Sequence, residues 1–219
     1  MKILALEFST DRRSVALTVG GRVLARAEES GTRASHPFHL IRQALSEARL
    51  EQTEIECLAV GVGPGSYTGI RTAIAIAQGW QLARPVRLLA LNSLDCLAAQ
   101  LAREGRTGEW HLVVDAQRGD LYRAVYSLDG GEFARLEPLA IASLAEVRAS
   151  VPASAHVAGP EATRWFPEAL AAAPGAETLG CLAASRTQFL DGGQLEPIYL
   201  REVSFVKAPP PRQLNLDES

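Results

Sequence analysis

A glycine-rich segment between an apolar run and a long amphipathic run carries the residues of this chain best placed for binding chemistry. It reads Gly61-Val62-Gly63-Pro64-Gly65-Ser66-Tyr67-Thr68-Gly69-Ile70-Arg71. Glycine lets the backbone approach a ligand or a second segment closely, and the start of a helix presents N–H groups without partners in the helix. The segment is therefore either an anion or partner site, or a structural turn in which Ser66 caps the following helix.

Three common site motifs do not fit this segment. A Walker A loop requires GxxxxGK[ST], and the only nearby basic residue is Arg71 rather than a lysine. A dinucleotide fingerprint requires a third glycine where Ser66 stands and an acidic residue after the next strand, where this chain has Asn92. A nucleophile elbow requires GxSxG, whereas Ser66 directly follows Gly65. These three chemistries are excluded.

Histidines and a polar hairpin are the other candidates for chemistry. His36 and His39 lie at a predicted helix start without an HExxH pattern or an acidic partner, which favours capping or solvation over metal binding. His111 and His156 lie in strand-like runs and are interpreted as structural. A last group either contacts a partner or RNA or only closes its own turn: Asp115, Arg118, Asp120 and Tyr122.

The composition restricts the class of protein. With 219 residues, 47% of them hydrophobic, the chain can form a sizeable core, and a net charge of −3 argues against binding nucleic acid through a basic face without a partner. Cys57, Cys96 and Cys181 are widely spaced and indicate neither a disulfide framework nor a zinc site. The apolar run at 3–8 is too short for a signal peptide, and no run reaches the roughly 18 residues of a membrane span. We therefore expect a cytoplasmic protein.

Hydrophobic periodicity predicts a first series of strands and helices. Strands are expected at 3–8, at 14–28 as a hairpin with a primed turn at Gly20-Gly21, at 57–62 and at 87–91. Helices are expected at 35–50, 66–83 and 93–103.

A second series follows the polar break at 104–108. Strands are expected at 110–115, 121–127, 133–141 and 156–158, and helices at 143–150, 161–172 and 179–190. Both series open with strands whose tight turns follow an acidic residue, Glu7 or Asp115, which predicts a duplicated unit. Residues 208–219, with three consecutive prolines, are predicted to form a flexible tail.

Three separated motifs occur together in the chain. They are Ile3-Leu4-Ala5-Leu6-Glu7-Phe8-Ser9-Thr10, Gly63-Pro64-Gly65-Ser66-Tyr67-Thr68-Gly69-Ile70-Arg71 and Val114-Asp115-Ala116-Gln117-Arg118-Gly119-Asp120-Leu121-Tyr122. In this order they resemble the bacterial TsaB (YeaZ) family of tRNA threonylcarbamoyladenosine biosynthesis proteins. Pro197-Ile198-Tyr199-Leu200-Arg201 also fits, so the resemblance extends from the first residue to about Arg201.

The resemblance implies an α/β fold of two RNase H-like lobes, as in actin, sugar kinases and Hsp70 (the ASKHA fold). The first lobe, with the partner-binding helices, is expected at 1–104 and the second at 105–207, before the tail at 208–219. The resemblance also implies a noncatalytic subunit that binds and activates the paralogue TsaD, in a complex with the ATPase TsaE. That complex transfers a threonylcarbamoyl group to the adenosine beside the anticodon of tRNA. Contact with tRNA would be indirect, and a homodimer is expected as an alternative when TsaD is absent.

The residues at the position of the TsaD metal ligands predict no metal here. TsaD enzymes carry Asn-His-Leu-Glu-Gly-His, with two histidines on one helix face that can share a metal. This chain has Asn92-Ser93-Leu94-Asp95-Cys96-Leu97, with Ser93 and Leu97 at the two ligand positions. Leucine cannot coordinate a cation, so we expect no catalytic metal and no catalytic residue.

A vestigial nucleotide site is predicted at Ser9, Thr10, Gly65 and Ser66. Glu7 stands where the phosphate loop of the fold and most TsaB relatives carry aspartate, which weakens any metal or nucleotide role. Ser9 and Thr10 either donate hydrogen bonds to a nucleotide or close the hairpin turn. Gly159 followed by Pro160 makes a weak adenosine pocket. We expect no cofactor, while a nucleotide at the partner interface is left open.

The helix at 66–83 is the predicted partner surface. Its apolar residues cover more than one core-facing arc, and its alanines permit close contact between helices. The predicted interface residues are Ile70, Ala73, Ile74, Ala77 and Trp80. With the helix at 35–50 they would pair with the same helices of TsaD or of a second copy, and a charge at Ile74 or Ala77 is expected to abolish assembly without unfolding the lobe. The alternative is a helix buried inside the first lobe.

Two enzyme classes are the alternatives to a noncatalytic subunit. A small-molecule kinase of the ASKHA fold requires competent phosphate and adenosine motifs, and both are degraded here. A metallopeptidase, a label that the family once attracted, fails at Ser93 and Leu97.

Overall fold

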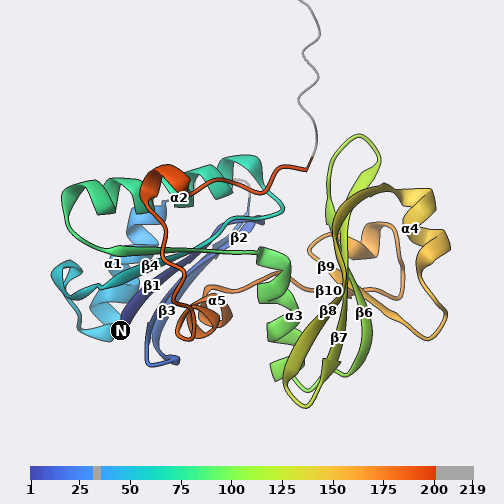
Figure 1. Ribbon diagram of the computed structural model, residues 1–219, viewed down its shortest axis with the longest axis horizontal. Helices are drawn as coiled ribbons and strands as arrows, with labels where there is room; N and C mark the ends of the chain where they lie inside the picture. The colour runs from blue at the N-terminus through green and yellow to red at the C-terminus, as the bar shows by residue number, and fades with distance from the viewer. Residues whose placement is uncertain (32–35, 201–219) are drawn as a thin grey trace, which may run out of the picture.

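Two five-stranded sheets lie beside each other in the computed structural model, which describes residues 1–31 and 36–200 (Figure 1). The first sheet consists of β1 (Lys2–Glu7), β2 (Arg12–Val19), β3 (Arg22–Ser30), β4 (Cys57–Gly61) and β5 (Arg87–Leu91), in the order β3-β2-β1-β4-β5. The second consists of β6 (Gly108–Asp115), β7 (Asp120–Asp129), β8 (Glu132–Ser143), β9 (His156–Gly159) and β10 (Leu170–Ala171), in the order β10-β9-β6-β7-β8. The predicted tail at 208–219 lies outside the described residues.

The two sheets have the same topology. Read from its other edge, the second sheet runs β8-β7-β6-β9-β10, which matches β3-β2-β1-β4-β5 strand for strand. In each, the first strand pairs antiparallel with the second and parallel with the fourth. The predicted duplicated unit and the predicted α/β class with two RNase H-like lobes are therefore confirmed.

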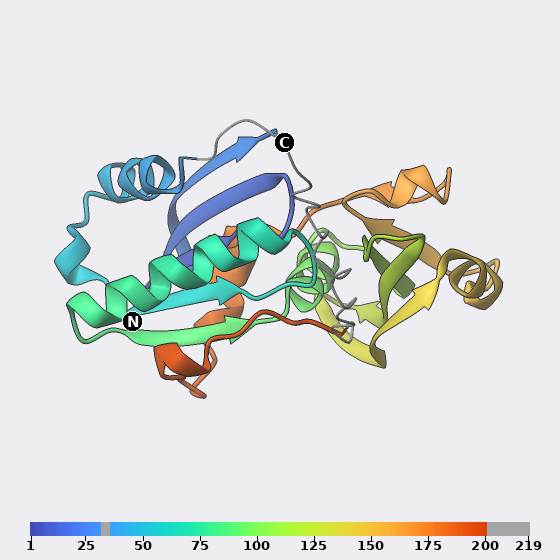
Figure 2. The same cartoon turned by 90° about the horizontal axis from the view of Figure 1, so that it is seen from above.

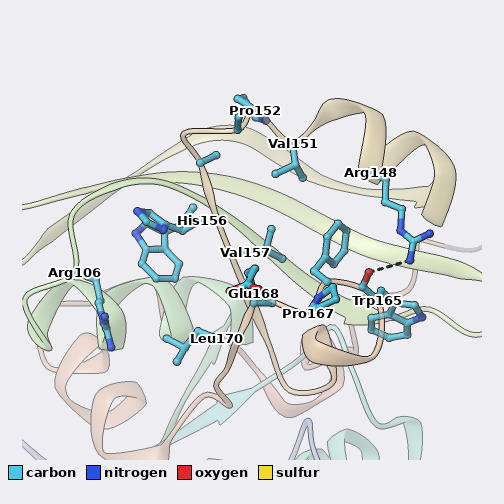
Figure 3. A pocket seen from close by; sticks show the side chains of 15 residues that line it. Arg106, Arg148, Val151, Pro152, His156, Val157, Trp165, Pro167, Glu168 and Leu170 are labelled. Atoms are coloured by element: carbon cyan, nitrogen blue, oxygen red, sulfur yellow. Dashed lines mark hydrogen bonds between the residues drawn. The ribbon is translucent and has the colours of Figure 1, made fainter.

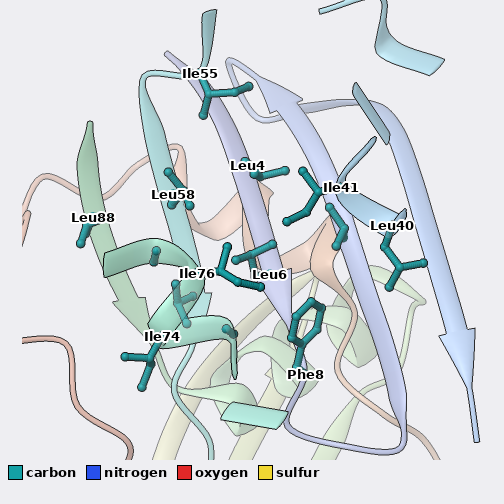
Figure 4. Close-up of a cluster of buried hydrophobic side chains, with 14 of the residues drawn as sticks. Leu4, Leu6, Phe8, Leu40, Ile41, Ile55, Leu58, Ile74, Ile76 and Leu88 are labelled. Atoms are coloured by element: carbon teal, nitrogen blue, oxygen red, sulfur yellow. The ribbon is translucent and has the colours of Figure 1, made fainter. Parts of the chain in front are cut away.

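The first sheet is covered on both faces. Side chains alternate along a strand, so Leu4 and Leu6 of β1 point to one face and Ile3 and Ala5 to the other. The helices α1 (Pro37–Ala48) and α2 (Tyr67–Ala83) cover one face of the sheet (Figure 2). Leu4 and Leu6 belong to the buried cluster on that face, which Figure 4 shows. The opposite face packs against α5 (Ala176–Ala183). A fully buried leucine or isoleucine stabilises such a core by about 1.5–3 kcal/mol.

Each half of the chain contributes its last helix to the sheet of the other half. The helix α3 (Ser93–Arg103) follows the first sheet in sequence but packs on β6, β7 and β8, while α5 follows the second sheet and packs on β1 and β2. The two helices also contact each other between the sheets. The predicted division at 104 and 105 separates the two sequence repeats, and α3 and α5 each pack on the sheet of the other repeat. Each sheet is hydrophobic on both faces. The helices α3 and α5 cover the face of each sheet that the helices of its own repeat leave open.

The second lobe carries less helix than the first. Its outer face is covered by α4 (Leu144–Ser150), which follows a capping box at Ser143 and Glu146. The helix predicted at 161–172 is wrong, because the chain forms only a 3-10 turn, η2 (Ala162–Arg164), before β10 pairs with β9. Pro167 lacks the N–H that a helix would need there. Two further 3-10 turns are η1 (Gln52–Glu54) and η3 (Gly192–Gln194).

Most remaining element predictions are confirmed with shifted ends. Gly20 and Gly21 both have positive φ, +58° and +79°, as the predicted primed turn requires. The last helix spans Ala176–Ala183 instead of 179–190. The helix expected at 35–50 begins at Pro37, and residue 35 lies outside the described residues. Among the described residues, no helix is long and apolar enough to cross a membrane.

Candidate functional site

The glycine-rich segment forms the junction between β4 and α2. The helix begins at Tyr67, and the hydroxyl oxygen of its N-cap, Ser66, accepts a hydrogen bond from the N–H of Gly69 at 3.3 Å. The Gly63–Pro64 peptide bond is cis. The structural interpretation of the segment, a turn capped by Ser66, is confirmed.

The glycines of the junction allow close approach to another part of the chain. The N–H of Ser66 donates to the carbonyl oxygen of Ser9 at 2.6 Å. A Cβ at Gly65 would lie 2.1 Å from that same oxygen, and one at Gly69 would lie 2.0 Å from the carbonyl oxygen of Phe8. The junction is therefore packed directly on the turn between β1 and β2.

The four residues predicted for a vestigial nucleotide site lie together at this contact. Ser9 and Thr10 are 2% and 5% exposed. The Thr10 hydroxyl donates to the carbonyl oxygen of Arg12 and accepts from the Arg12 N–H, so it closes the hairpin turn. The Ser9 hydroxyl oxygen is buried without a hydrogen-bond partner among the described residues. The turn accounts for Thr10 and Ser66, and a nucleotide at these residues stays a prediction.

Glu7 is the buried charged residue at the centre of this region. It is fully buried, and its carboxylate accepts hydrogen bonds from the Ser9 N–H and the Ser93 hydroxyl, both at 2.9 Å. The Ser93 hydroxyl oxygen in turn accepts from the N–H of Gly63 at 3.2 Å. Burial raises the pKa of Glu7 above its usual value of 4.5, and the hydrogen bonds from Ser9 and Ser93 oppose part of that rise. One carboxylate thus joins the end of β1, the β4–α2 junction and the start of α3.

Gly61 provides the space that this carboxylate occupies. A Cβ at Gly61 would lie 2.0 Å from Oε2 of Glu7, so no other residue type fits while Glu7 keeps this position. The longer acid at position 7 and the glycine at position 61 therefore form one packing unit.

The positions compared with metal ligands have other tasks in this chain. The Ser93 hydroxyl is committed to Glu7, and Leu97 is fully buried in the core between α3 and the second sheet. Over the described residues, no group of three or more histidine, cysteine, aspartate or glutamate side chains is arranged to hold a metal ion. Glu7 and Ser93 form a structural clamp, in which one hydrogen bond joins the end of β1 to the start of α3.

The residues predicted as the partner interface face inward. Ile70, Ala73, Ile74 and Ala77 are between 0% and 6% exposed, and Trp80 is half-buried. They pack in the core beneath α2, where Figure 4 shows Ile74 together with Leu6 and Phe8 of the first sheet. The prediction of Ile70, Ala73, Ile74 and Ala77 as partner contacts is therefore wrong, because the sheet already covers them, whereas Trp80 also lines a groove on the other side of the helix. A charge at Ile74 would enter the core rather than an interface.

The outward face of the same helix is small and exposed. Ala75, Gly79 and Ala83 recur every four residues and are exposed, and Leu82 is 90% exposed. Beside them, a groove of about 390 Å³ separates α2 from α1, with Phe38, 66% exposed, at its rim. The indole N–H of Trp80 in this groove is buried and has no acceptor among the described residues. The sequence feature that could have indicated this exposed face is the four-residue spacing of small residues. It was missed because apolar residues occur around most of the helix.

An aromatic cluster at the start of α2 was also missed. The rings of Tyr67 and Tyr199 stack with centroids 5.6 Å apart, and Nε of Arg71 donates to the Tyr199 hydroxyl at 3.1 Å. The Arg71 guanidinium lies 4.4 Å from the Tyr67 ring centre. Tyr199 reaches this place because the Ile198 N–H donates to the carbonyl oxygen of Val62.

Contacts within the chain place three of the other candidate residues in local structure. His111 is buried, and its ring nitrogens contact Glu109 and Arg123. Asp115 accepts from the N–H of Gln117 at 2.7 Å, which closes the β6–β7 turn. His36 occupies the N-cap position of α1 without a side-chain capping bond.

Gly159, the glycine of the predicted adenosine pocket, lies at the end of β9. A Cβ there would lie 1.9 Å from the carbonyl oxygen of Val113, so Gly159 permits close packing of β9 on β6. The neighbouring Glu161 carboxyl is partly buried, and burial together with Asp115 and Asp11 raises its pKa.

Comparisons with known proteins agree with this geometry. The family model of TsaD, tRNA N6-adenosine threonylcarbamoyltransferase, matches residues 34–175. The tRNA threonylcarbamoyladenosine biosynthesis protein TsaB of Escherichia coli (strain K12) is 33% identical over 132 residues, which are 59% of this chain and 56% of that protein. TsaB of Bacillus subtilis (strain 168) is 29% identical over 147 residues, 63% of this chain and 60% of that protein. The chain thus matches little more than half the length of these relatives.

A solved structure extends the similarity over nearly the whole chain. YeaZ from Pseudomonas aeruginosa superposes with a TM-score of 0.77 at 29% sequence identity. The superposition covers 91% of this chain and 99% of the other.

Proposed function

The chain belongs to the TsaB (YeaZ) family, and on this premise we propose that it is a noncatalytic subunit of a tRNA-modifying complex. In this proposal it binds and activates a TsaD-type transferase, which passes a threonylcarbamoyl group to the adenosine beside the anticodon of tRNA. A TsaE-type ATPase completes the complex. Contact between tRNA and this chain is indirect, through the other members of the complex. The protein acts in the cytoplasm and pairs with a second copy when the transferase is absent.

The observation that carries the proposal is the outward face of α2. Ala75 and Gly79 allow the backbone of a partner helix to approach closely, as small residues do at helix contacts. Leu82 and Phe38 on either side supply exposed apolar surface, which a soluble monomer rarely groups without a partner. The Trp80 N–H buried in the groove lacks an acceptor among the described residues, and an unsatisfied buried donor costs about 1–3 kcal/mol. This face therefore supports a helix-to-helix interface.

The Glu7 clamp supports the noncatalytic part of the proposal. Its carboxylate and the Ser93 hydroxyl are buried and bound to each other, so neither is directed at a substrate. A kinase of this fold would use the β1–β2 turn for phosphate, where the Thr10 hydroxyl is engaged with Arg12. The hydrogen bonds of Glu7, Ser93 and Thr10 therefore weigh against the kinase and metallopeptidase alternatives.

The two lobes are proposed as the functional units of the subunit. We propose that residues 1–104 form the partner-binding repeat and residues 105–207 the second repeat, with α5 exchanged onto the first sheet. The α1 and α2 helices then belong to the repeat that binds the transferase.

The proposal is tested by binding of a purified TsaD-type transferase to matched variants of the chain. Ala75→Glu places a charge on the exposed outward face of α2, and Ala145→Glu places the same charge on exposed α4. We expect Ala75→Glu to abolish the complex in gel filtration and calorimetry, while Ala145→Glu binds as the wild type does. Equal binding by both folded variants would refute the α2 interface.

A further inference from the structure

The second lobe has a cavity where the first lobe has a long helix. In the first lobe, the 17-residue α2 connects β4 to β5, whereas only the three-residue η2 and a turn connect β9 to β10. A cavity of about 770 Å³ opens beside this shorter connection, bounded by residues 151–157 and 165–170 (Figure 3). Its lining includes no residue of α1 or α2, and its volume lies in the range of small-molecule sites.

The cavity is lined by aromatic rings. At one end, His156 stacks on Trp110 with ring centroids 4.7 Å apart, and at the other end lies Trp165 (Figure 3). The Trp110 ring is held in place because its indole N–H donates to the carbonyl oxygen of Thr107 at 3.0 Å. Phe166 and Val157 add apolar lining to the cavity. Fixed rings of this kind favour a flat aromatic ligand over a flexible one.

Two cations flank the rings. Arg106 lies at the His156 end and Arg148 at the Trp165 end, as Figure 3 shows. Arg148 donates from Nη2 to the carbonyl oxygen of Trp165 at 2.9 Å, which orients its guanidinium. Neither arginine forms an ion pair with a carboxylate of residues 1–31 or 36–200. Both guanidiniums thus remain able to bind an anionic group, for which arginine offers paired N–H donors.

A carboxylate lies between the two ends of the cavity. Glu168 lines the cavity and is labelled between these ends in Figure 3. Like the arginines, it has no ion-pair partner among the described residues. A carboxylate accepts hydrogen bonds, so it suits an amino group on the ring of a ligand.

We propose that this cavity is a binding site for a nucleoside monophosphate whose base carries an amino group. The base lies against the His156–Trp110 stack with its amino group toward Glu168, and the phosphate binds Arg148. This site is separate from the partner face on α2, and the inference does not depend on the proposed function.

The positions of the tryptophans provide the test. The chain has three tryptophans, of which Trp110 and Trp165 line the cavity and Trp80 lies on α2. We would label the full chain with fluorotryptophan, assign the three fluorine signals with single Trp→Phe variants, and titrate adenosine monophosphate. We expect the Trp110 and Trp165 signals to shift and the Trp80 signal to stay, with a Kd of about 0.1–1 mM.

Matched variants separate the site from general charge effects. Arg148→Ala should weaken binding about tenfold or more, because a charge-assisted contact to phosphate is lost. Arg106→Ala leaves the Arg148–Trp165 contact intact and should weaken binding less than Arg148→Ala, because the phosphate binds Arg148. Arg103→Ala removes the same charge from the exposed end of α3 outside the cavity and should bind as the wild type does. Thermal melting of each variant verifies its fold.

The chemistry of the ligand is tested with its parts. Adenosine should shift Trp110 at higher concentration than the monophosphate, and inorganic phosphate alone should leave the Trp110 signal in place. The proposal is overturned if the monophosphate shifts neither cavity tryptophan, if phosphate alone reproduces the shifts, or if Arg103→Ala weakens binding as much as Arg148→Ala does.

Discussion

The two lobes share one strand order but differ in what connects their fourth and fifth strands. In the first lobe, α2 spans Tyr67–Ala83 and buries a full face on the sheet, which leaves a second face of small residues exposed. In the second lobe, the corresponding connection is a 3-10 turn and a loop, and an aromatic cavity remains. The same repeat thus offers a helix surface on one side of the molecule and a hollow on the other.

Because of this difference, the two lobes present different kinds of surface although their strands are arranged alike. A long helix with a small outer face is suited to another helix, whereas a ring-lined cavity is suited to a small ligand. Between the lobes, α3 is almost entirely buried and contacts α5 and the second sheet. Glu7 fixes the start of α3 through Ser93, so the relation of the lobes depends on a buried carboxylate.

The largest expected effect distinguishes the two faces of α2. Ile74→Glu places a carboxylate in the first core, where Ile74 is 6% exposed, and should reduce the free energy of unfolding by roughly 4 kcal/mol or more. Ala75→Glu, one residue further on, should change it by less than about 0.5 kcal/mol because Ala75 is exposed. Urea unfolding measures both. Similar losses would contradict the assignment of inner and outer faces.

The next effect compares a glycine of the β4–α2 junction with a glycine of the β6–β7 turn. Gly65→Ala would bring a Cβ within 2.1 Å of the Ser9 carbonyl oxygen at a φ of +145°, whereas Gly119 has a φ of +85° and open space around its Cβ. We expect Gly65→Ala to cost roughly 3 kcal/mol or more and Gly119→Ala about 1 kcal/mol. Thermal unfolding by calorimetry provides the measurement. A smaller loss at Gly65 than at Gly119 would show that the junction does not pack on the first turn as described.

A more modest loss is expected where α3 meets the second sheet. The Tyr126 hydroxyl donates to Oδ1 of Asp95 at 2.8 Å, and Arg135 also contacts that oxygen. Tyr126→Phe removes this hydrogen bond to a charged group and should cost about 1.5 kcal/mol. Phe133→Leu, a change to a side chain that packs on the same ring, is a control that keeps the hydrogen bond. If Tyr126→Phe has no effect on urea unfolding, α3 is held on the second sheet by apolar packing alone.

The smallest effect is expected for Glu7→Gln, which keeps the shape of the side chain and one of its two acceptor oxygens. Burial raises the pKa of Glu7, so between about 4.5 and that raised pKa the folded state holds a proton that the unfolded state releases. The contribution of Glu7 to stability is therefore complete below pH 4.5 and is lost as the pH rises through the pKa of the folded state.

The variant lacks this titration, so it should gain stability relative to the wild type as the pH rises. Urea unfolding of both proteins at a series of pH values measures the difference. All other carboxyl groups are present in both proteins, so their effects on the pH dependence of stability cancel in this comparison. A difference that does not vary with pH would mean that Glu7 titrates normally in the folded protein.

The sequence predicted the repeats and their strands because period-two alternation and glycine turns are local signals. Gly20-Gly21 and the N-cap at Ser66 follow from chemistry within a few residues. The exchange of α3 and α5 between sheets could not be predicted, because hydrophobic patterns indicate that a helix is buried but not which sheet buries it.

Four of the five predicted interface residues lie on the inner face of α2, whereas the partner surface that we propose is its outward face. Ile70 and Ile74 are large apolar residues of α2, and such residues indicate burial without distinguishing a sheet from a partner. The Glu7–Ser93 hydrogen bond joins residues 86 positions apart, and the cavity combines residues from three segments. Neither the hydrogen bond nor the cavity produces a pattern within a single stretch of sequence.

The account rests on activation of a transferase through the outer face of α2, and reconstitution of the reaction tests it most directly. We would measure threonylcarbamoyladenosine formed on tRNA by a TsaD-type transferase and a TsaE-type ATPase, supplied with ATP and threonylcarbamoyl-adenylate. The account predicts product with the wild-type chain and with Ala145→Glu, and only background when the chain is omitted or carries Ala75→Glu. Equal product without the chain would contradict it.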